Sequence, residues 1–154
     1  MRRWRRLVDD ASRSDKSGDE GAGAAGGVGF LSLSFFNAEY RSGANLFLEL
    51  IGAKEEVDAT STVFTGEGRI DASSLSGKCV LPILEIVRTK NARAILVCGS
   101  YDEGVVKQLQ GDYPVIGVVA LSDSGLKKSD QISRASEILY SQLKLNLKLS
   151  WFSS

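Results

Sequence analysis

The sequence Thr65-Gly-Glu-Gly-Arg-Ile-Asp71 places two carboxylates and one guanidinium within five residues, namely Glu67, Arg69 and Asp71. Carboxylates can accept a proton or bind a divalent cation, and arginine binds phosphate or carboxylate groups through two parallel hydrogen bonds. Gly66 and Gly68 allow a tight backbone path around these side chains. The pattern predicts a site for a negatively charged metabolite. The alternative is an arginine–carboxylate pair that only ties the turn together.

Gly77 and Lys78 follow shortly afterwards and invite comparison with a phosphate-binding loop. The strict motif fails, because Ala72 stands where its first glycine is required and Cys79 stands where it needs serine or threonine. Pro82 belongs in the first turn of a helix, which places the helix start near Lys78. Lys78 and the free amides there could meet an anion. A surface lysine without a role is the equally open alternative.

A second glycine cluster, Gly-Ala-Gly-Ala-Ala-Gly-Gly-Val-Gly, occupies residues 21–29. Its glycines at positions 21, 23 and 26 satisfy the spacing of the dinucleotide fingerprint, but that fingerprint requires a strand directly before it. Residues 16–20 are polar and cannot form a buried strand, which argues against NAD binding. Two interpretations remain: small residues for close helix packing, or successive amides that hold a phosphate or carboxylate.

The elements that position these motifs alternate along the chain. Short runs rich in Val and Ile predict strands at residues 61–65, 94–98 and 115–121. Amphipathic stretches between and after them predict helices at residues 78–89, 103–110 and 129–143. This order is typical of a three-layer α/β fold with a parallel sheet. Ligands bind such sheets outside the carboxyl ends of the strands, where residues 65–78 and Ser100 would lie. Asp102 and Glu103 fit the first turn of a helix, and residues 122–125 are polar and unspecific.

The rest of the chain is less regular. We expect a polar, flexible arm at residues 1–20, an α/β domain at residues 21–145 and an irregular tail at residues 146–154. Within the domain, apolar spacing predicts a buried helix from residue 28 to about residue 40 and a second helix from residue 43 to Gly52. Leucines alternate with polar residues at positions 143–149, which fits an edge strand or a fraying end of the last helix.

Composition narrows the function classes. Hydrophobic residues make up 43% and charged residues 25%, as in globular proteins, and 19 basic residues balance 19 acidic ones. We therefore expect neither nucleic acid nor a membrane as a partner. The absence of histidine excludes Ser-His-Asp and Cys-His catalysis and most zinc sites. Cys79 and Cys98 lie in apolar runs, which predicts buried thiols, a reducing compartment and a cytoplasmic location.

Taken in order, residues 21–29, 65–71, Gly77-Lys78 and Cys98-Gly-Ser100 with Gly104 resemble the glycerate kinase family. The resemblance runs from about residue 21 to residue 143. It implies a Rossmann-like or flavodoxin-like sheet and a partial copy of a two-domain enzyme, limited to the carboxyl-terminal part. Ser73, Ser74 and Ser76 stand where members usually carry Gln, Thr and often His, and Glu20 stands where they commonly carry Pro. These departures indicate a truncated or diverged copy.

The resemblance also implies the reaction, ATP-dependent phosphorylation of D-glycerate to 2-phosphoglycerate with Mg²⁺. It implies that Asp71 or Glu67 holds Mg²⁺ or accepts the hydroxyl proton, and that Arg69 and Lys78 clamp phosphate or the glycerate carboxylate. The residues implied to bind substrate or phosphate are Gly21, Gly23, Gly26, Gly27, Gly66, Gly68, Gly77 and Ser100. A homo-oligomer is left open. The alternatives are a non-catalytic module of the same family that binds an anion or a nucleotide, and an unrelated flavodoxin-like domain.

Overall fold

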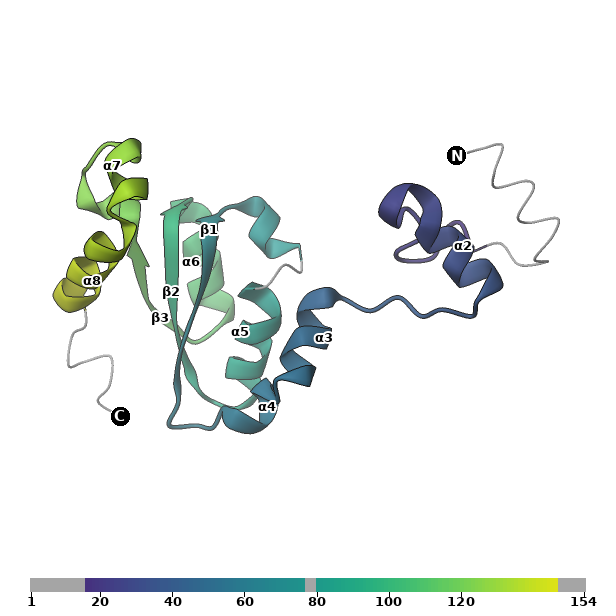
Figure 1. Cartoon of the computed structure of the whole chain (residues 1–154). Coiled ribbons are helices and arrows are strands. Elements are labelled where there is room, and N and C mark those ends of the chain that lie inside the picture. The colour runs from purple at the N-terminus through teal and green to yellow at the C-terminus, as the bar shows by residue number, and fades with distance from the viewer. Residues whose placement is uncertain (1–15, 77–79, 147–154) are drawn as a thin grey trace. The chain divides into compact units, whose positions relative to one another are not determined.

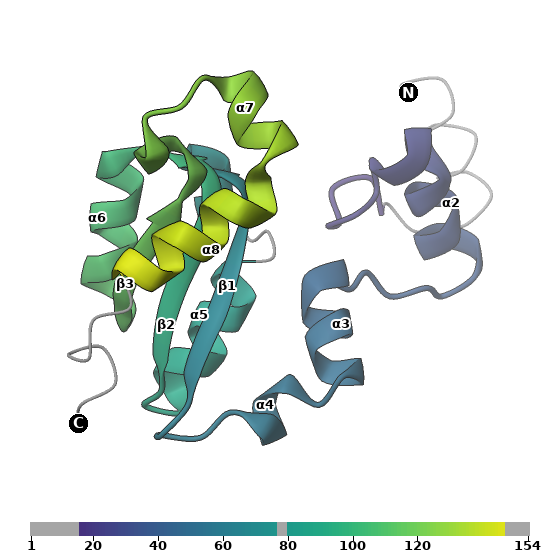
Figure 2. The same cartoon turned by 60° about the vertical axis from the view of Figure 1, so that its left-hand side comes forward.

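The chain divides into two compact units, Met1–Gly43 and Ala44–Ser154. The computed structural model describes residues 16–76 and 80–146. In the second unit, strands β1 (Thr62–Ile70), β2 (Arg93–Tyr101) and β3 (Val115–Ala120) form a parallel sheet in the order β1-β2-β3. Helices α5 (Val80–Thr89) and α6 (Glu103–Asp112) cover one face, and α8 (Ala135–Asn146) lies on the other (Figures 1 and 2). The predicted three-layer α/β fold is therefore confirmed.

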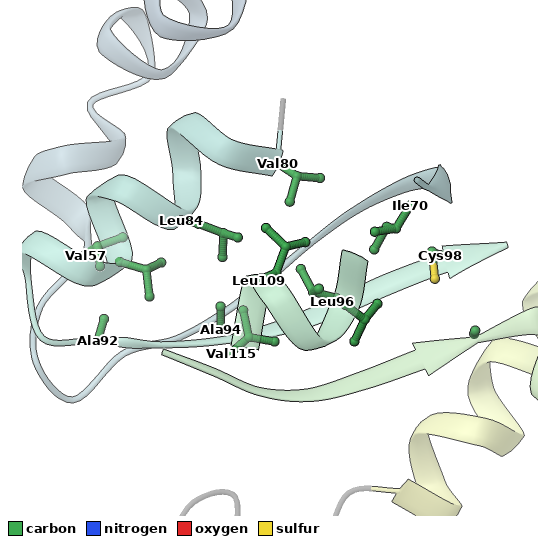
Figure 3. Packing of buried hydrophobic residues seen from close by; sticks show 13 residues of the cluster. Val57, Ile70, Val80, Leu84, Ala92, Ala94, Leu96, Cys98, Leu109 and Val115 are labelled. Carbon is green, nitrogen blue, oxygen red and sulfur yellow. The ribbon is translucent and has the colours of Figure 1, made fainter. Parts of the chain in front are cut away.

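The main core lies between the sheet and helices α5 and α6 (Figure 3). Leu84 of α5, Leu96 of β2 and Leu109 of α6 are all completely buried in this cluster. Side chains alternate along a strand, so Ile95 falls on the opposite face from Leu96, and it too is completely buried. On the α8 side of the sheet Ile138 is buried as well. A strand with both faces covered needs a continuous apolar run, which is why β2 could be predicted from its sequence.

Leu84→Ala is expected to lower the free energy of unfolding by about 3 kcal/mol, because it opens a cavity in a core that is fully packed. Urea denaturation followed by circular dichroism measures this change. Leu145→Ala is the matched control, since the Leu145 side chain on α8 is 75% exposed and its loss should cost less than about 0.5 kcal/mol. Equal losses in the two variants would contradict the packing described here.

Two predicted features of the second unit differ in the structure. The helix expected at residues 129–143 is divided into α7 (Lys128–Ser133) and α8, because Arg134 between them leaves helical geometry. Helix α8 continues to Asn146, so the alternating leucines up to that point belong to a helix and not to an edge strand. Residues 147–154, including the rest of that pattern, lie outside the described residues.

Phe64 of β1 is 49% exposed, so the second face of this strand is less covered than expected.

The first unit contains a short 3-10 helix, η1 (Ala24–Gly27), and α2 (Val28–Phe35). Helix α2 ends five residues earlier than predicted, and Asn37 just beyond it adopts a left-handed conformation (φ 48°), as residues that end helices often do. The expectation that this helix is buried along Val28, Leu31 and Phe35 is wrong, because these side chains are exposed. The buried residue of α2 is Phe30, which clusters with Ala22 and Leu33.

A second predicted helix is confirmed as α3 (Gly43–Leu50), and Gly52, in a left-handed conformation, separates it from α4 (Ala53–Glu56). The apolar stripe predicted for this helix is exposed, at Phe47 and Leu50 of α3 and at Ile51 directly after it. Among the described residues, every helix is too short or too polar to cross a lipid bilayer.

Candidate active site

The motif at residues 65–71 is not the turn that its glycines and charges suggested. Strand β1 continues to Ile70, and its register pairs Glu67 with Cys98 and Arg69 with Ser100 of β2. The glycines explain the difference. A Cβ atom on Gly66 would collide with the carbonyl oxygen of Val97 on β2, so glycine lets the two strands approach closely there. The chain leaves the sheet only at Asp71.

Glu67 is held by a serine from the segment that follows the strand. This segment is the 3-10 helix η2 (Ala72–Leu75), and Asp71 caps its start. The hydroxyl of Ser74 donates a hydrogen bond to Oε1 of Glu67 and accepts one from the backbone N–H of Asp71 at 3.2 Å. Ser74 is completely buried, whereas Glu67 is half-buried. Ser74 is not among the predicted site residues, although its distance of three residues from Asp71 fits a capping box.

Arg69 and Asp71 pair with each other. Arg69 Nε lies 3.3 Å from Asp71 Oδ2, and the two side chains are 68% and 37% exposed. The other carboxylate oxygen, Oδ1, accepts hydrogen bonds from the backbone N–H and the hydroxyl of Ser73, at 2.9 and 2.7 Å. The alternative of an internal arginine–carboxylate pair therefore describes this structure. Exposed pairs contribute no more than about 1 kcal/mol, so an anionic ligand could replace Asp71 on Arg69 at little cost.

The carboxyl ends of all three strands meet near Glu67. Burial, followed by the negative charges of Asp123 and Glu67, raises the pKa of the Cys98 thiol to about 11. Burial, followed by the negative charge of Asp123 and a hydrogen bond to it, likewise raises the pKa of the Tyr101 hydroxyl. Asp123 belongs to the 3-10 helix η3 (Leu121–Ser124), directly after β3. The polar sequence of this segment carries no specific motif, and only its position directly after a parallel strand indicates that it lies at the site.

Cys98 should react with thiol reagents slowly in the native protein at pH 8 to 9, and faster as the pH rises toward 11, because the thiolate is the nucleophile. As the pH rises from 9 toward 11, the Cys98 thiol stays protonated in the folded state but ionises in the unfolded state. The free energy of unfolding should therefore fall over this range. Alkylation rates and urea midpoints in a Cys79→Ser background measure both effects. Native and urea-unfolded protein reacting equally fast at pH 8.5 would contradict this assignment.

Asp102 and Ser100 lie at the end of β2 and have different surroundings. Asp102 caps helix α6, accepting hydrogen bonds from the backbone N–H groups of Gly104 and Val105 at 2.8 and 3.1 Å. This supports the helix-start interpretation. Ser100 pairs with Arg69 in the sheet and is half-buried, next to the candidate site.

The glycine cluster at residues 21–29 belongs to the first unit. Residues 17–23 form turns and bends, so the strand that a dinucleotide fingerprint requires is absent there. Gly21, Gly26 and Gly27 adopt positive φ angles of 83°, 67° and 105°. A Cβ atom on Gly29 would collide with the carbonyl oxygen of Gly21, which supports the interpretation as close packing. The predicted anion cradle, including Gly23, stays a prediction, and Gly77 and Lys78 lie outside the described residues.

Comparison with known proteins gives a consistent family. A model of the "Glycerate kinase family" matches residues 1–147. The chain is 29% identical over 147 residues to "Glycerate 2-kinase" of Escherichia coli and 29% identical over 144 residues to "Glycerate kinase" of Bacillus subtilis, with 92% and 90% of the chain covered. It spans 39% and 38% of the length of these relatives. A crystal structure from Salmonella typhimurium LT2, provisionally assigned as glycerate kinase 2, matches 94% of the chain and 36% of its own length with a TM-score of 0.60 and 24% identity.

Proposed function

Since the chain belongs to the glycerate kinase family, we propose that it takes part in the ATP-dependent phosphorylation of D-glycerate at its 2-hydroxyl group. The observation that carries this proposal is the placement of Glu67, Arg69 and Asp71 at the carboxyl end of a parallel strand, with Glu67 hydrogen-bonded to a buried serine. The names of the relatives from Escherichia coli and Bacillus subtilis support it. Family membership excludes the unrelated flavodoxin-like domain.

Phosphoryl transfer needs positive charge near the phosphates and a well-aligned hydroxyl group more than it needs covalent help. Arg69 supplies a two-pronged cation for a phosphate or for the glycerate carboxylate. Both oxygens of Asp71 are engaged by Ser73 and Arg69, so Asp71 is better suited to shaping the site. Glu67 is the better candidate to accept the hydroxyl proton, which general-base catalysis requires, or to bind the metal ion.

The residues fit a magnesium ion brought in with ATP. No group of three or more acidic, histidine or cysteine side chains within the described part of the chain could hold a metal ion. Mg²⁺ bound with a nucleotide needs only one or two carboxylates, because phosphates and water supply its other ligands. Glu67 would hold it, since the hydroxyl of Ser74 binds only Oε1, one of its two carboxylate oxygens. Bound there, the ion would offset the negative charge of the phosphates.

A coupled assay of ADP release tests the proposal. We expect the purified chain to release ADP only when D-glycerate and Mg²⁺ are both present. Release that does not depend on D-glycerate, or no release although the protein is folded, would overturn it. L-Glycerate is the matched control substrate, because it differs only in the configuration at the reacting carbon.

The second candidate function is a non-catalytic module that binds an anion or a nucleotide. One observation favours it: Arg69 pairs internally with Asp71, so its guanidinium already has an anionic partner within the chain. Calorimetry with D-glycerate and with ATP distinguishes the two functions. Binding of either ligand without ADP release would favour the module.

Cellular location and assembly stay predictions. Cys98 is a buried free thiol. The predicted cytoplasmic location awaits a localisation experiment, and the homo-oligomer left open by the resemblance awaits a measurement of mass in solution.

A further inference from the structure

Ser74 is a completely buried polar residue, which is uncommon for serine. Buried hydroxyl groups need hydrogen-bond partners, and the partners of Ser74 are the two acidic residues of the motif. It accepts from the backbone N–H of Asp71 and donates to the carboxylate of Glu67. One side chain therefore connects the end of β1 with the candidate carboxylate within it.

The direction of these hydrogen bonds is fixed by chemistry. A backbone N–H can only donate, so the bond from Asp71 occupies a lone pair of the Ser74 oxygen. An ionised carboxylate can only accept, so the single hydroxyl proton of Ser74 goes to Oε1 of Glu67. Capping of η2 therefore uses the Ser74 oxygen only as an acceptor. The hydrogen bond that the Ser74 hydroxyl donates to Glu67 is not needed for the cap and is free to hold the Glu67 carboxylate.

We propose that Ser74 is a positioning residue, which fixes the carboxylate of Glu67 for the phosphoryl-transfer reaction. This inference rests on the proposed function, because it assigns Glu67 to that reaction. Fixing one carboxylate oxygen limits the rotation of a half-buried side chain and leaves the other oxygen for the substrate hydroxyl or Mg²⁺. Residues that orient a reacting group in this way raise the turnover rate without contacting the substrate.

Two variants and one control test the assignment. Ser74→Ala removes the hydroxyl, and Ser74→Thr keeps it. Ser76→Ala makes the same chemical change at an exposed serine of the same segment, whose hydroxyl donates to the carbonyl oxygen of Ser73 at 2.6 Å. We expect Ser74→Ala to lower kcat by about 10-fold to 100-fold, with the KM for ATP changed less than about 2-fold. Ser74→Thr should restore most of kcat, and Ser76→Ala should match the parent protein.

A second readout does not depend on activity. The carboxyl carbon of Glu67, observed by NMR at one pH, reports the hydrogen bond from residue 74. Its chemical shift should change in Ser74→Ala and remain close to that of the parent in Ser74→Thr and Ser76→Ala. Thermal melting of each variant separates loss of fold from loss of positioning.

Each outcome has a distinct meaning. The expected shift change together with the loss and rescue of kcat supports the assignment. An unchanged Glu67 signal in Ser74→Ala, an unchanged kcat, or a loss in Ser74→Thr equal to that in Ser74→Ala overturns it. If the parent protein has no glycerate-dependent turnover but the Glu67 signal responds as expected, the proposed function fails, and with it the catalytic part of the assignment, while the hydrogen bond itself stands.

Discussion

Glu67→Gln is expected to lower D-glycerate-dependent turnover by about 100-fold or more, the effect of removing a general base. The change keeps the size of the side chain, and the amide oxygen of glutamine can still accept the hydrogen bond from Ser74. The fold should therefore survive, while the carboxylate that accepts a proton or binds Mg²⁺ is lost. Initial rates of ADP release over a range of D-glycerate concentrations measure kcat and KM separately.

Glu103→Gln serves as the control for this experiment. Glu103 lies in the first turn of α6 with its side chain 80% exposed, 3.9 Å from Lys107. Removing its charge should leave turnover within about 2-fold of the parent, because exposed ion pairs contribute little. Full activity in Glu67→Gln would remove Glu67 from the reaction.

Gly66→Ala is expected to destabilise the protein by about 3 kcal/mol, because the added methyl group has no room between β1 and β2. The added Cβ would meet the carbonyl oxygen of Val97, which is backbone of the central strand and cannot rotate away. The strands must separate locally, and that weakens the hydrogen bonds beside Glu67 and Cys98. Urea denaturation gives the change in the free energy of unfolding.

Gly68→Ala is the matched control, two residues along the same strand. A Cβ atom on Gly68 would meet no atom within 4 Å, so the substitution should change the free energy of unfolding by less than about 1 kcal/mol. Equal destabilisation by the two variants would show that the loss arises from the removal of a glycine and not from contact with β2.

The sheet and its helices could be predicted because several sequence signals agreed. The apolar runs of β2 and β3, each followed by a helix, identified parallel strands covered on both faces. The acids at the start of α6 were correctly assigned to its beginning, where Asp102 is the cap. Parallel topology then placed Ser100 and the residues 65–71 at the same end of the sheet.

The course of β1 could not be predicted, because local preference and tertiary packing disagree there. Two glycines and three charged residues favour a turn when the sequence is considered alone. Pairing with β2 makes the segment a strand instead, and Gly66 is needed for close approach to Val97 and not for a bend. The hydrogen bond from Ser74 to Glu67 could not be predicted from the sequence either, because it forms only when η2 folds back toward β1.

The helical differences have a similar cause. Apolar spacing at residues 28–40 was consistent with one helix, but Asn37 adopts a left-handed conformation beyond the end of α2. The stripe of apolar residues there and on α3 is exposed, so helical spacing identified the type of element without identifying its buried face.

The most direct test of the central claim is an amide NMR titration of the chain with D-glycerate in the presence of Mg²⁺ and ADP. Because ADP replaces ATP, D-glycerate is not phosphorylated during the titration, and the shifts report only where it binds. The account predicts saturable shifts at the backbone amides of Glu67, Arg69, Asp71 and Ser100, which the structure brings to one end of the sheet. Saturable binding that shifts amides elsewhere and leaves these four unchanged would contradict it.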